Sequence, residues 1–175
     1  MRRMDLFTQY GMIIAEEAIQ DSGLDLEKIN LDKAGVIWGS GIGGLRTLES
    51  NVSEHALGKG IPRYNPFMIP KMIPDIAPGL ISIKYGFRGI NYATVSACAS
   101  ASHAIINSFD YIRLGKADVM ITGGSEAVIT MTGIGGFNAM KALSTRKDDP
   151  KTASRPFDLN REAVSYTHLT LPTKA

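Results

Sequence analysis

The sequence is poor in several features that would assign a protein to a class directly. Its 175 residues include one cysteine, an aromatic share of 7% and a formal net charge of +2. No apolar run is long enough to span a bilayer. One cysteine excludes an internal disulfide and fits a reducing cytoplasm. Because the small net charge also argues against bulk nucleic-acid binding, we expect a cytoplasmic protein whose partners are neither nucleic acid nor membrane.

Short apolar runs alternate with segments of helical periodicity. Apolar side chains at helical spacing predict a helix over residues 5–21, and a buried strand is expected at 34–38. Five prolines predict loops and short helices over 62–78. Further strands are expected at 92–95 and 119–122, and further helices up to Leu57, over 79–85 and over 99–114. This alternation predicts an α/β fold with a mainly parallel sheet, in a chain long enough for one domain with its own core.

The single cysteine, Cys98, lies between a predicted strand and a predicted helix. The first turn of a helix has unpaired N–H groups and the positive end of the helix dipole, and both stabilise a thiolate. A backbone N–H there can also donate to a developing oxyanion. Small neighbours leave room for an acyl chain. The alternative is a buried core cysteine, which is the commoner fate of a lone cysteine, and position alone leaves both open.

The histidines offer no obvious base for this thiol. His103 follows Cys98 by five residues, which on a helix turns it about 140° away, so we interpret it as a packing or surface residue. His55 lies in a polar helix and is expected to be solvated. His168 belongs to the anomalous final segment. A partner base, if there is one, is therefore expected outside this chain.

A glycine pattern follows the predicted strand at 34–38. Gly39, Gly41 and Gly44 satisfy G-x-G-x-x-G before a helix, as in a dinucleotide-binding loop. That reading also needs an acidic residue ending a second strand about 20 residues later, and residues 58–63 have the composition of a loop instead. Gly58-Lys59 also lacks the upstream glycine of a P-loop. We expect the glycines to let the loop approach something bulky, such as an acyl chain or a helix.

The final segment, residues 164–175, is unlike the rest of the chain. It reads VSYTHLTLPTKA and has neither helical nor alternating periodicity. Codons for its first six residues can spell the transposon mosaic end used in preparing sequencing libraries, and that reading also changes the codon of Ala163. We expect these residues to be foreign to the natural protein; an unusual natural C-terminus is the alternative.

Six motifs together resemble those of one enzyme family. They are SGIGG (40–44), NPFMIP (65–70), SACASASHA (96–104), DVMITGGSEA (118–127), GGFNAMKALSTR (135–146) and ASRPFD (153–158). In this order and spacing they resemble the condensing enzymes, and most of all the β-ketoacyl-acyl carrier protein synthase II family. The resemblance covers residues 1 to about 162. The family continues with glycine and phenylalanine, where this chain has Ala163 and Val164.

The resemblance implies a thiolase-like fold of two similar α/β halves, with residues 1–163 forming most of the first half without its opening strands. It implies that Cys98 takes an acyl group from a carrier thioester. Malonyl-carrier protein then loses carbon dioxide, and its carbanion attacks the acyl-enzyme. The family's two histidines, its lysine and its second oxyanion donor lie in the second half. No cofactor and no metal are implied.

The resemblance also assigns binding residues. Ile42, Met68 and Phe137 are expected to line the acyl pocket, with Met68 reaching across the interface of a homodimer. The partner is an acidic acyl carrier protein, expected to dock on Arg2, Arg3, Arg63 and Lys141. The alternatives are an ordinary core residue for Phe137 and scattered solvated charges for the cations.

Two other functions stay open. The chain could come from a polyketide synthase ketosynthase, although the presence of Cys98 argues against the non-catalytic chain-length partner, in which this position is not cysteine. It could also be an inactive remnant that only folds or dimerises.

Overall fold

The structure is a computed structural model that describes residues 3–58 and 63–161. It divides into two compact units, Met1–Val128 and Ile129–Ala175, each considered by itself below. Arg2 and the final segment 164–175, about which the sequence made specific predictions, lie outside the described residues.

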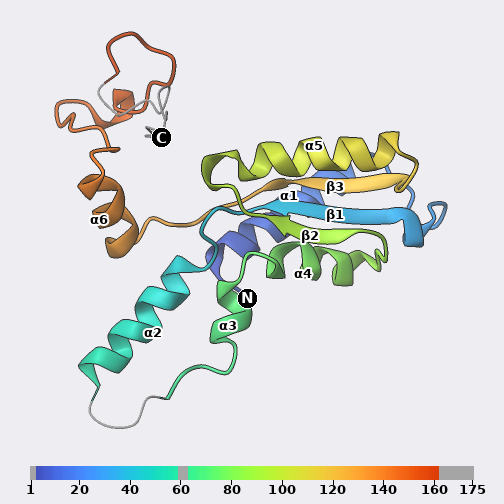
Figure 1. Ribbon diagram of the computed structural model, residues 1–175, viewed down its shortest axis with the longest axis horizontal. Coiled ribbons are helices and arrows are strands. Elements are labelled where there is room, and N and C mark those ends of the chain that lie inside the picture. The colour runs from blue at the N-terminus through green and yellow to red at the C-terminus, as the bar shows by residue number, and fades with distance from the viewer. Residues whose placement is uncertain (1–2, 59–62, 162–175) are drawn as a thin grey trace, which may run out of the picture. The chain divides into compact units, whose positions relative to one another are not determined.

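A parallel sheet organises the first unit. It contains β1 (Ala34–Gly39), β2 (Asn91–Thr94) and β3 (Val119–Gly124) in the order β2-β1-β3. β1 runs down the middle (Figure 1), and every one of its residues is buried, as expected for a central strand covered on both faces. Gly39 at the end of β1 pairs with Thr94 on one side and Gly124 on the other. The carboxyl ends of the three strands therefore meet at one edge, and the predicted α/β class is confirmed.

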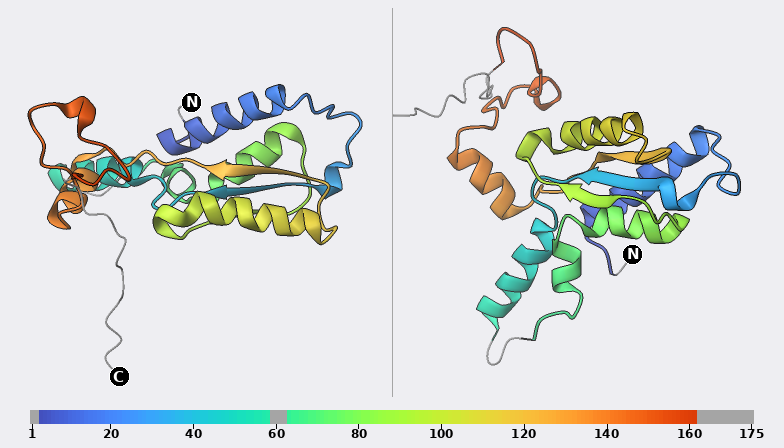
Figure 2. Two further views of the ribbon diagram at one scale, coloured as in Figure 1. Left: turned by 90° about the horizontal axis from the view of Figure 1, so that it is seen from above. Right: turned by 45° about the vertical axis from the view of Figure 1, so that its right-hand side comes forward.

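Helices cover both faces of this sheet. α1 (Leu6–Asp21) and α4 (Ile76–Tyr85) lie on one side and α5 (Ser100–Arg113) on the other, as Figure 2 shows. Phe7, Val36 and Ile81 are fully buried in the core beneath α1 and α4. Ile37, also fully buried, points the opposite way because side chains alternate along a strand. The outer face of α5 is apolar yet open: Ile105, Phe109 and Ile112 are 53%, 58% and 45% exposed.

Glycines at the ends of two strands bring α5 close to the sheet. A Cβ atom at Gly39 would lie 2.4 Å from the backbone nitrogen of Ala101, and one at Gly124 would lie 2.7 Å from the Cβ of Ala101. No side chain fits at either distance. The first turn of α5 is thereby held directly over the carboxyl ends of β1 and β3.

The helices and strands that the sequence predicted are present, with boundaries that differ by a few residues. The helix expected from residue 79 begins at Ile76, because Pro78 falls in its first turn, where a backbone N–H has no intrahelical partner to lose. The other elements are η1 (Leu31–Lys33), α2 (Leu45–Leu57), α3 (Met68–Met72), η2 (Ala97–Ala99), α6 (Met131–Ala139) and η3 (Pro150–Thr152). Within the described residues, no helix combines the length and the apolar character needed to cross a membrane.

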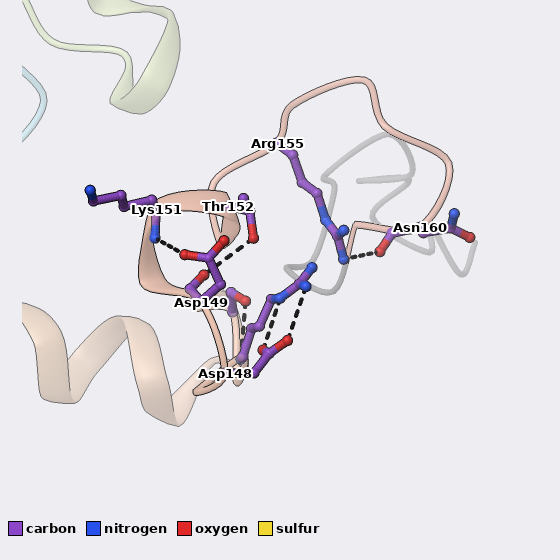
Figure 3. A network of polar contacts seen from close by, with 8 residues as sticks. Asp148, Asp149, Lys151, Thr152, Arg155 and Asn160 are labelled. Atoms are coloured by element: carbon purple, nitrogen blue, oxygen red, sulfur yellow. Dashed lines mark hydrogen bonds and ion pairs between the residues drawn. The ribbon is translucent and has the colours of Figure 1, made fainter.

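The second unit contains α6 and η3. Thr130 caps α6 by accepting a hydrogen bond from the backbone nitrogen of Gly133 at 3.0 Å. Asp149 caps η3 by accepting from the backbone nitrogen of Lys151 at 3.1 Å (Figure 3). Arg146 binds Asp148 through two parallel hydrogen bonds of 2.9 and 3.0 Å. Because this guanidinium favours the charged carboxylate, the pKa of Asp148 is held below its usual range.

Candidate active site

Three loops converge at the carboxyl edge of the sheet. Residues 40–44, called the glycine loop below, follow β1. Residues 95–99, called the cysteine turn, follow β2, and Ser125 and Glu126 follow β3. Since the strands are parallel and in register at this edge, loops far apart in sequence become neighbours. Ligands of open α/β sheets bind at this kind of edge.

Cys98 lies in the cysteine turn, within η2 and directly before α5, so its predicted position between strand and helix is confirmed. The residue is exposed rather than buried in the core. Ala97, immediately before it, has a φ of 50°, a left-handed conformation that is uncommon for a residue other than glycine. Such a conformation persists only where surrounding contacts impose it. The contacts around the turn therefore hold the backbone that carries Cys98 in one conformation.

Ser100 supplies the contacts that hold this turn. Its hydroxyl donates to the carbonyl oxygen of Ala97 at 2.7 Å and accepts from the backbone nitrogen of Ser96 at 2.9 Å. Its own carbonyl oxygen accepts from the hydroxyl of Thr94, at the end of β2, at 2.8 Å. Ser100 is only 3% exposed. One buried serine thus joins the strand end, the left-handed residue and the helix start.

His103 contributes to the same turn in a way that the sequence analysis missed. Its exposed ring places Nδ1 2.7 Å from the hydroxyl of Ser96, seven residues earlier. The interpretation as a surface residue is correct, but the residue also contacts the loop that carries Cys98. Because η2 continues directly into α5, the side chains of Ser96 and His103 come within hydrogen-bonding distance. The spacing between His103 and Cys98, which was all that the sequence analysis considered, did not reveal this contact.

Glu126 binds the glycine loop; it lies in the sequence motif at 118–127 but was assigned no role from the sequence. Its Oε2 accepts from the backbone nitrogens of Gly41 and Ile42 at 2.7 and 2.8 Å. Its Oε1 accepts from the backbone nitrogen of Gly43 at 3.0 Å and from the hydroxyl of Ser40 at 3.2 Å. The N–H groups that a phosphate would use in a dinucleotide loop are therefore engaged by the protein's own carboxylate. The sequence did hold a signal for this contact, because Glu126 is an acidic residue that directly follows β3, and β3 pairs with β1.

Two of the predicted pocket residues lie on segments that touch. Ile42 is in the glycine loop, 44% exposed, and the half-buried Met68 begins α3. The backbone nitrogen of Gly44 donates to the carbonyl oxygen of Met72, the last residue of α3, at 2.9 Å. The third residue, Phe137, is half-buried on α6 of the second unit, so its place in the pocket stays a prediction.

The predicted docking cations are exposed wherever they are described. Arg3 places its guanidinium 4.8 Å from the ring centre of Phe67, a cation–π distance that joins the start of the chain to the segment before α3. Arg63 is exposed in the same unit, and Lys141 is exposed just after α6 in the other. Two further cations that the sequence analysis did not select, Arg46 and Lys71, line a cavity of about 270 Å³.

The fold and the cysteine turn together agree with a known family. Residues 1–164 match the family described as beta-ketoacyl synthase, N-terminal domain. The chain belongs to this family. It is 48% identical over 161 residues to 3-oxoacyl-[acyl-carrier-protein] synthase 2 of Staphylococcus aureus, covering 92% of this chain and 40% of that protein. It is 45% identical to the Synechocystis sp. protein of the same name, covering 92% of this chain and 38% of the relative.

Solved structures extend the likeness to three dimensions. A β-ketoacyl synthase from Burkholderia phymatum superposes with a TM-score of 0.79 at 29% identity, covering 93% of this chain and 40% of that one. A type II polyketide acyl-carrier protein in complex with its ketosynthase gives a TM-score of 0.74 at 26% identity, covering 82% and 42%. The predicted thiolase-like fold is confirmed for this part of it. The chain spans about 40% of the length of the relatives it matches.

Proposed function

We propose that residues 1–163 are the N-terminal part of a 3-oxoacyl-acyl carrier protein synthase that elongates fatty acids, and that residues 164–175 are foreign to it. The observation that carries this proposal is the position of Cys98: exposed, on a braced turn, at the start of α5 and at the sheet edge. Family membership and the shared name of the 48% and 45% identical relatives support it.

The proposed reaction has two stages. The Cys98 thiolate attacks the carbonyl carbon of an acyl thioester, the oxyanion forms, and the carrier's thiol leaves as the acyl-enzyme is made. Malonyl-carrier protein then loses carbon dioxide, and the resulting carbanion attacks the acyl-enzyme carbonyl. The β-ketoacyl-carrier product departs and the Cys98 thiolate is regenerated. The backbone N–H of Cys98 serves as one oxyanion donor.

The remainder of the machinery is assigned to the part of the enzyme that this chain does not contain. Two histidines and a lysine that assist decarboxylation, and the second oxyanion donor, belong there by resemblance. Of the two histidines that lie within residues 3–58 and 63–161, only His103 has a recorded contact with the cysteine turn, and that contact is with Ser96. The proposed enzyme needs no cofactor and no metal, works in the cytoplasm, and forms a homodimer to which Met68 contributes.

An acidic acyl carrier protein is the proposed partner. Arg3 and Arg63, with Arg2 and Lys141, form the proposed docking set, and a 26% identical neighbour is a ketosynthase seen with its carrier protein. Arg46 and Lys71 add positive charge in the same unit as Arg3. A cationic surface of this kind accelerates association with an acidic partner.

The test is acyl transfer to the full-length enzyme. Incubation with acyl-carrier protein should add one acyl group to Cys98, located by mass spectrometry of the digested protein. Cys98→Ala should abolish the transfer and leave the unfolding temperature nearly unchanged, because the side chain is exposed and the change is small. An acyl group on another residue of the wild-type enzyme would refute the assignment.

A second candidate is the ketosynthase subunit of a polyketide synthase. The structural likeness to the polyketide ketosynthase complex favours it, whereas the higher identity to the 3-oxoacyl synthases favours fatty acid elongation. Product analysis separates the two. A fatty acid enzyme releases a carrier-bound product after one condensation, whereas a polyketide enzyme retains and extends unreduced β-keto products.

A further inference from the structure

The glycine loop forms an anion-binding nest, and the carboxylate of Glu126 occupies it. Three consecutive backbone nitrogens, of Gly41, Ile42 and Gly43, converge on one carboxylate at 2.7, 2.8 and 3.0 Å. Successive N–H groups arranged in this way make an anion-binding concavity. Bonds from N–H groups to a charged carboxylate are stronger than those to a neutral acceptor. The conformation of the loop is thus tied to the charge of a side chain more than 80 residues away.

The residue before Glu126 is itself fixed. The backbone nitrogen of Ser125 donates to the carbonyl oxygen of Gly39 at 3.0 Å. Its hydroxyl donates to the carbonyl oxygen of Phe7 at 2.8 Å and accepts from Nε1 of the buried Trp38 at 2.9 Å. These contacts anchor the chain after β3 to β1 and to α1. The carboxylate of Glu126 therefore extends from a fixed base.

The loop that Glu126 holds lies between the cysteine turn and the end of α3. A Cβ at Gly41 would lie 3.1 Å from the carbonyl oxygen of Ala97, the residue before Cys98. A Cβ at Gly43, whose φ is +74°, would lie 2.6 Å from the carbonyl oxygen of Met72 at the end of α3. Ile42 stands between these two contacts. A shift of the loop would move Ile42 relative to any acyl group on Cys98.

We propose that Glu126 is a positioning residue that fixes Ile42 against the acyl chain carried by Cys98. This inference rests on the proposed function. It assigns Glu126 no proton transfer and no contact with the reacting carbonyl. The ionised carboxylate is required because its two oxygens accept all four bonds, whereas a glutamine offers one acceptor oxygen and an NH₂ group that would face the loop's N–H donors.

The experiment compares Glu126→Gln, Glu126→Asp and Glu126→Ala in the full-length enzyme, with Glu54→Gln as the matched control. Glu54 is exposed on α2, so its substitution changes the same group away from the loop. Three quantities are measured for each variant. They are kcat/KM for acylation of Cys98 by short, medium and long acyl-carrier donors, the rate of Cys98 alkylation by iodoacetamide, and the unfolding temperature.

Glu126→Gln should lower kcat/KM for long acyl donors by about 10²-fold, the size typical of a misplaced reacting group, and less for short donors. Alkylation by iodoacetamide should stay near the wild-type rate, because the small reagent does not use the pocket. For Glu126→Asp, kcat/KM with long acyl donors should lie between the values of Glu126→Gln and wild type. Because Glu126→Ala vacates an anion nest, added formate should restore part of its long-chain acylation, and formate should not help Glu126→Gln.

The outcomes separate the possibilities. An unchanged chain-length profile in Glu126→Gln and Glu126→Ala overturns the inference while Cys98 acylation upholds the proposed function. An equal fall in acylation and alkylation, with a lower unfolding temperature and no formate effect, also overturns it, because that pattern belongs to a purely structural residue. If the wild-type enzyme is not acylated at Cys98, both the proposed function and the inference fail.

Discussion

Thr47, in the first turn of α2, donates two hydrogen bonds to one carboxylate oxygen of Asp5, the residue that precedes α1. The backbone nitrogen lies 3.0 Å from that oxygen, and the hydroxyl binds it as well. Both residues are buried, at 5% and 4% exposure. Asp5 stands at the N-cap of α1 yet makes no side-chain capping bond there. Its carboxylate instead ties the first helix to the residues just after the glycine loop.

Removing the Thr47 hydroxyl should therefore destabilise the fold. Thr47→Val keeps the shape but deprives a buried carboxylate of a donor, so the free energy of unfolding should fall by about 1–3 kcal/mol. Thr8→Val is the matched control: the Thr8 hydroxyl is buried and has no hydrogen-bond partner among residues 3–58 and 63–161, so this change should be neutral or stabilising. Urea unfolding of the full-length enzyme measures both. Equal losses in the two variants would contradict the role given to Thr47.

Ser100→Ala should impair the nucleophile rather than the pocket. The change removes the donor to Ala97 and the acceptor for the Ser96 nitrogen, so the left-handed Ala97 can relax and redirect Cys98. Acylation and iodoacetamide alkylation of Cys98 should both fall, acylation by about 10²-fold. Ser102→Ala, at an exposed position in the same helix, is the control and should behave as wild type. The prediction is wrong if alkylation keeps its wild-type rate in Ser100→Ala.

Ile42→Phe should shorten the longest acyl chain that the enzyme accepts. Ile42 is 44% exposed beside the turn that carries Cys98, and a larger side chain would occupy space that the acyl chain needs. Val52→Phe, a similar enlargement at an exposed position of α2, should leave the profile unchanged. Competition among acyl-carrier donors of different length gives the profile. An unaltered profile in Ile42→Phe would remove this residue from the pocket.

Arg63→Glu and Lys141→Glu should each raise the KM for acyl-carrier protein and leave transfer from a small acyl thioester nearly unchanged. The expected loss resides in association, so it should shrink as salt is added. Lys116→Glu is the control, because Lys116 lies between α5 and the start of β3, at the sheet edge opposite Cys98. Equal damage to both substrates would show that the two residues support the fold or the chemistry instead of docking.

A polar substitution on the apolar outer face of α5 should have opposite effects on the chain alone and on the full-length enzyme. Ile105, Phe109 and Ile112 are about half exposed in this chain, and we expect the rest of the full-length enzyme to cover them. The chain alone should be poorly soluble and should form no β-ketoacyl product. Phe109→Asp should raise the solubility of the chain alone, measured by light scattering, yet destabilise the full-length enzyme. If Phe109→Asp raised the solubility of the chain alone and also stabilised the full-length enzyme, the face would not be covered.

Local patterns predicted the elements well, because β1 is a continuous apolar run and Cys98 falls where a strand gives way to a helix. Contacts between distant residues escaped prediction. The bond from Gly41 to Glu126 joins residues 85 positions apart and depends on the register of β1 against β3, which no local pattern encodes. The bond from Ser96 to His103 depends on η2 running into α5. The pocket roles of Ile42, Met68 and Phe137 and the docking roles of the cations rest on resemblance and stay predictions.

The two glycines beneath α5 make the position of Cys98 depend on the packing of the helix against the sheet. Ala101 packs directly against Gly39 and Gly124, the last residues of β1 and β3. A single methyl group at either glycine would therefore push the N-terminal turn of α5 away from the sheet. Cys98 lies only three residues before that point of support. A substitution at either strand end, without touching the nucleophile, would therefore displace the Cys98 thiol, so an enzyme with an intact fold and an intact cysteine could still be inactive.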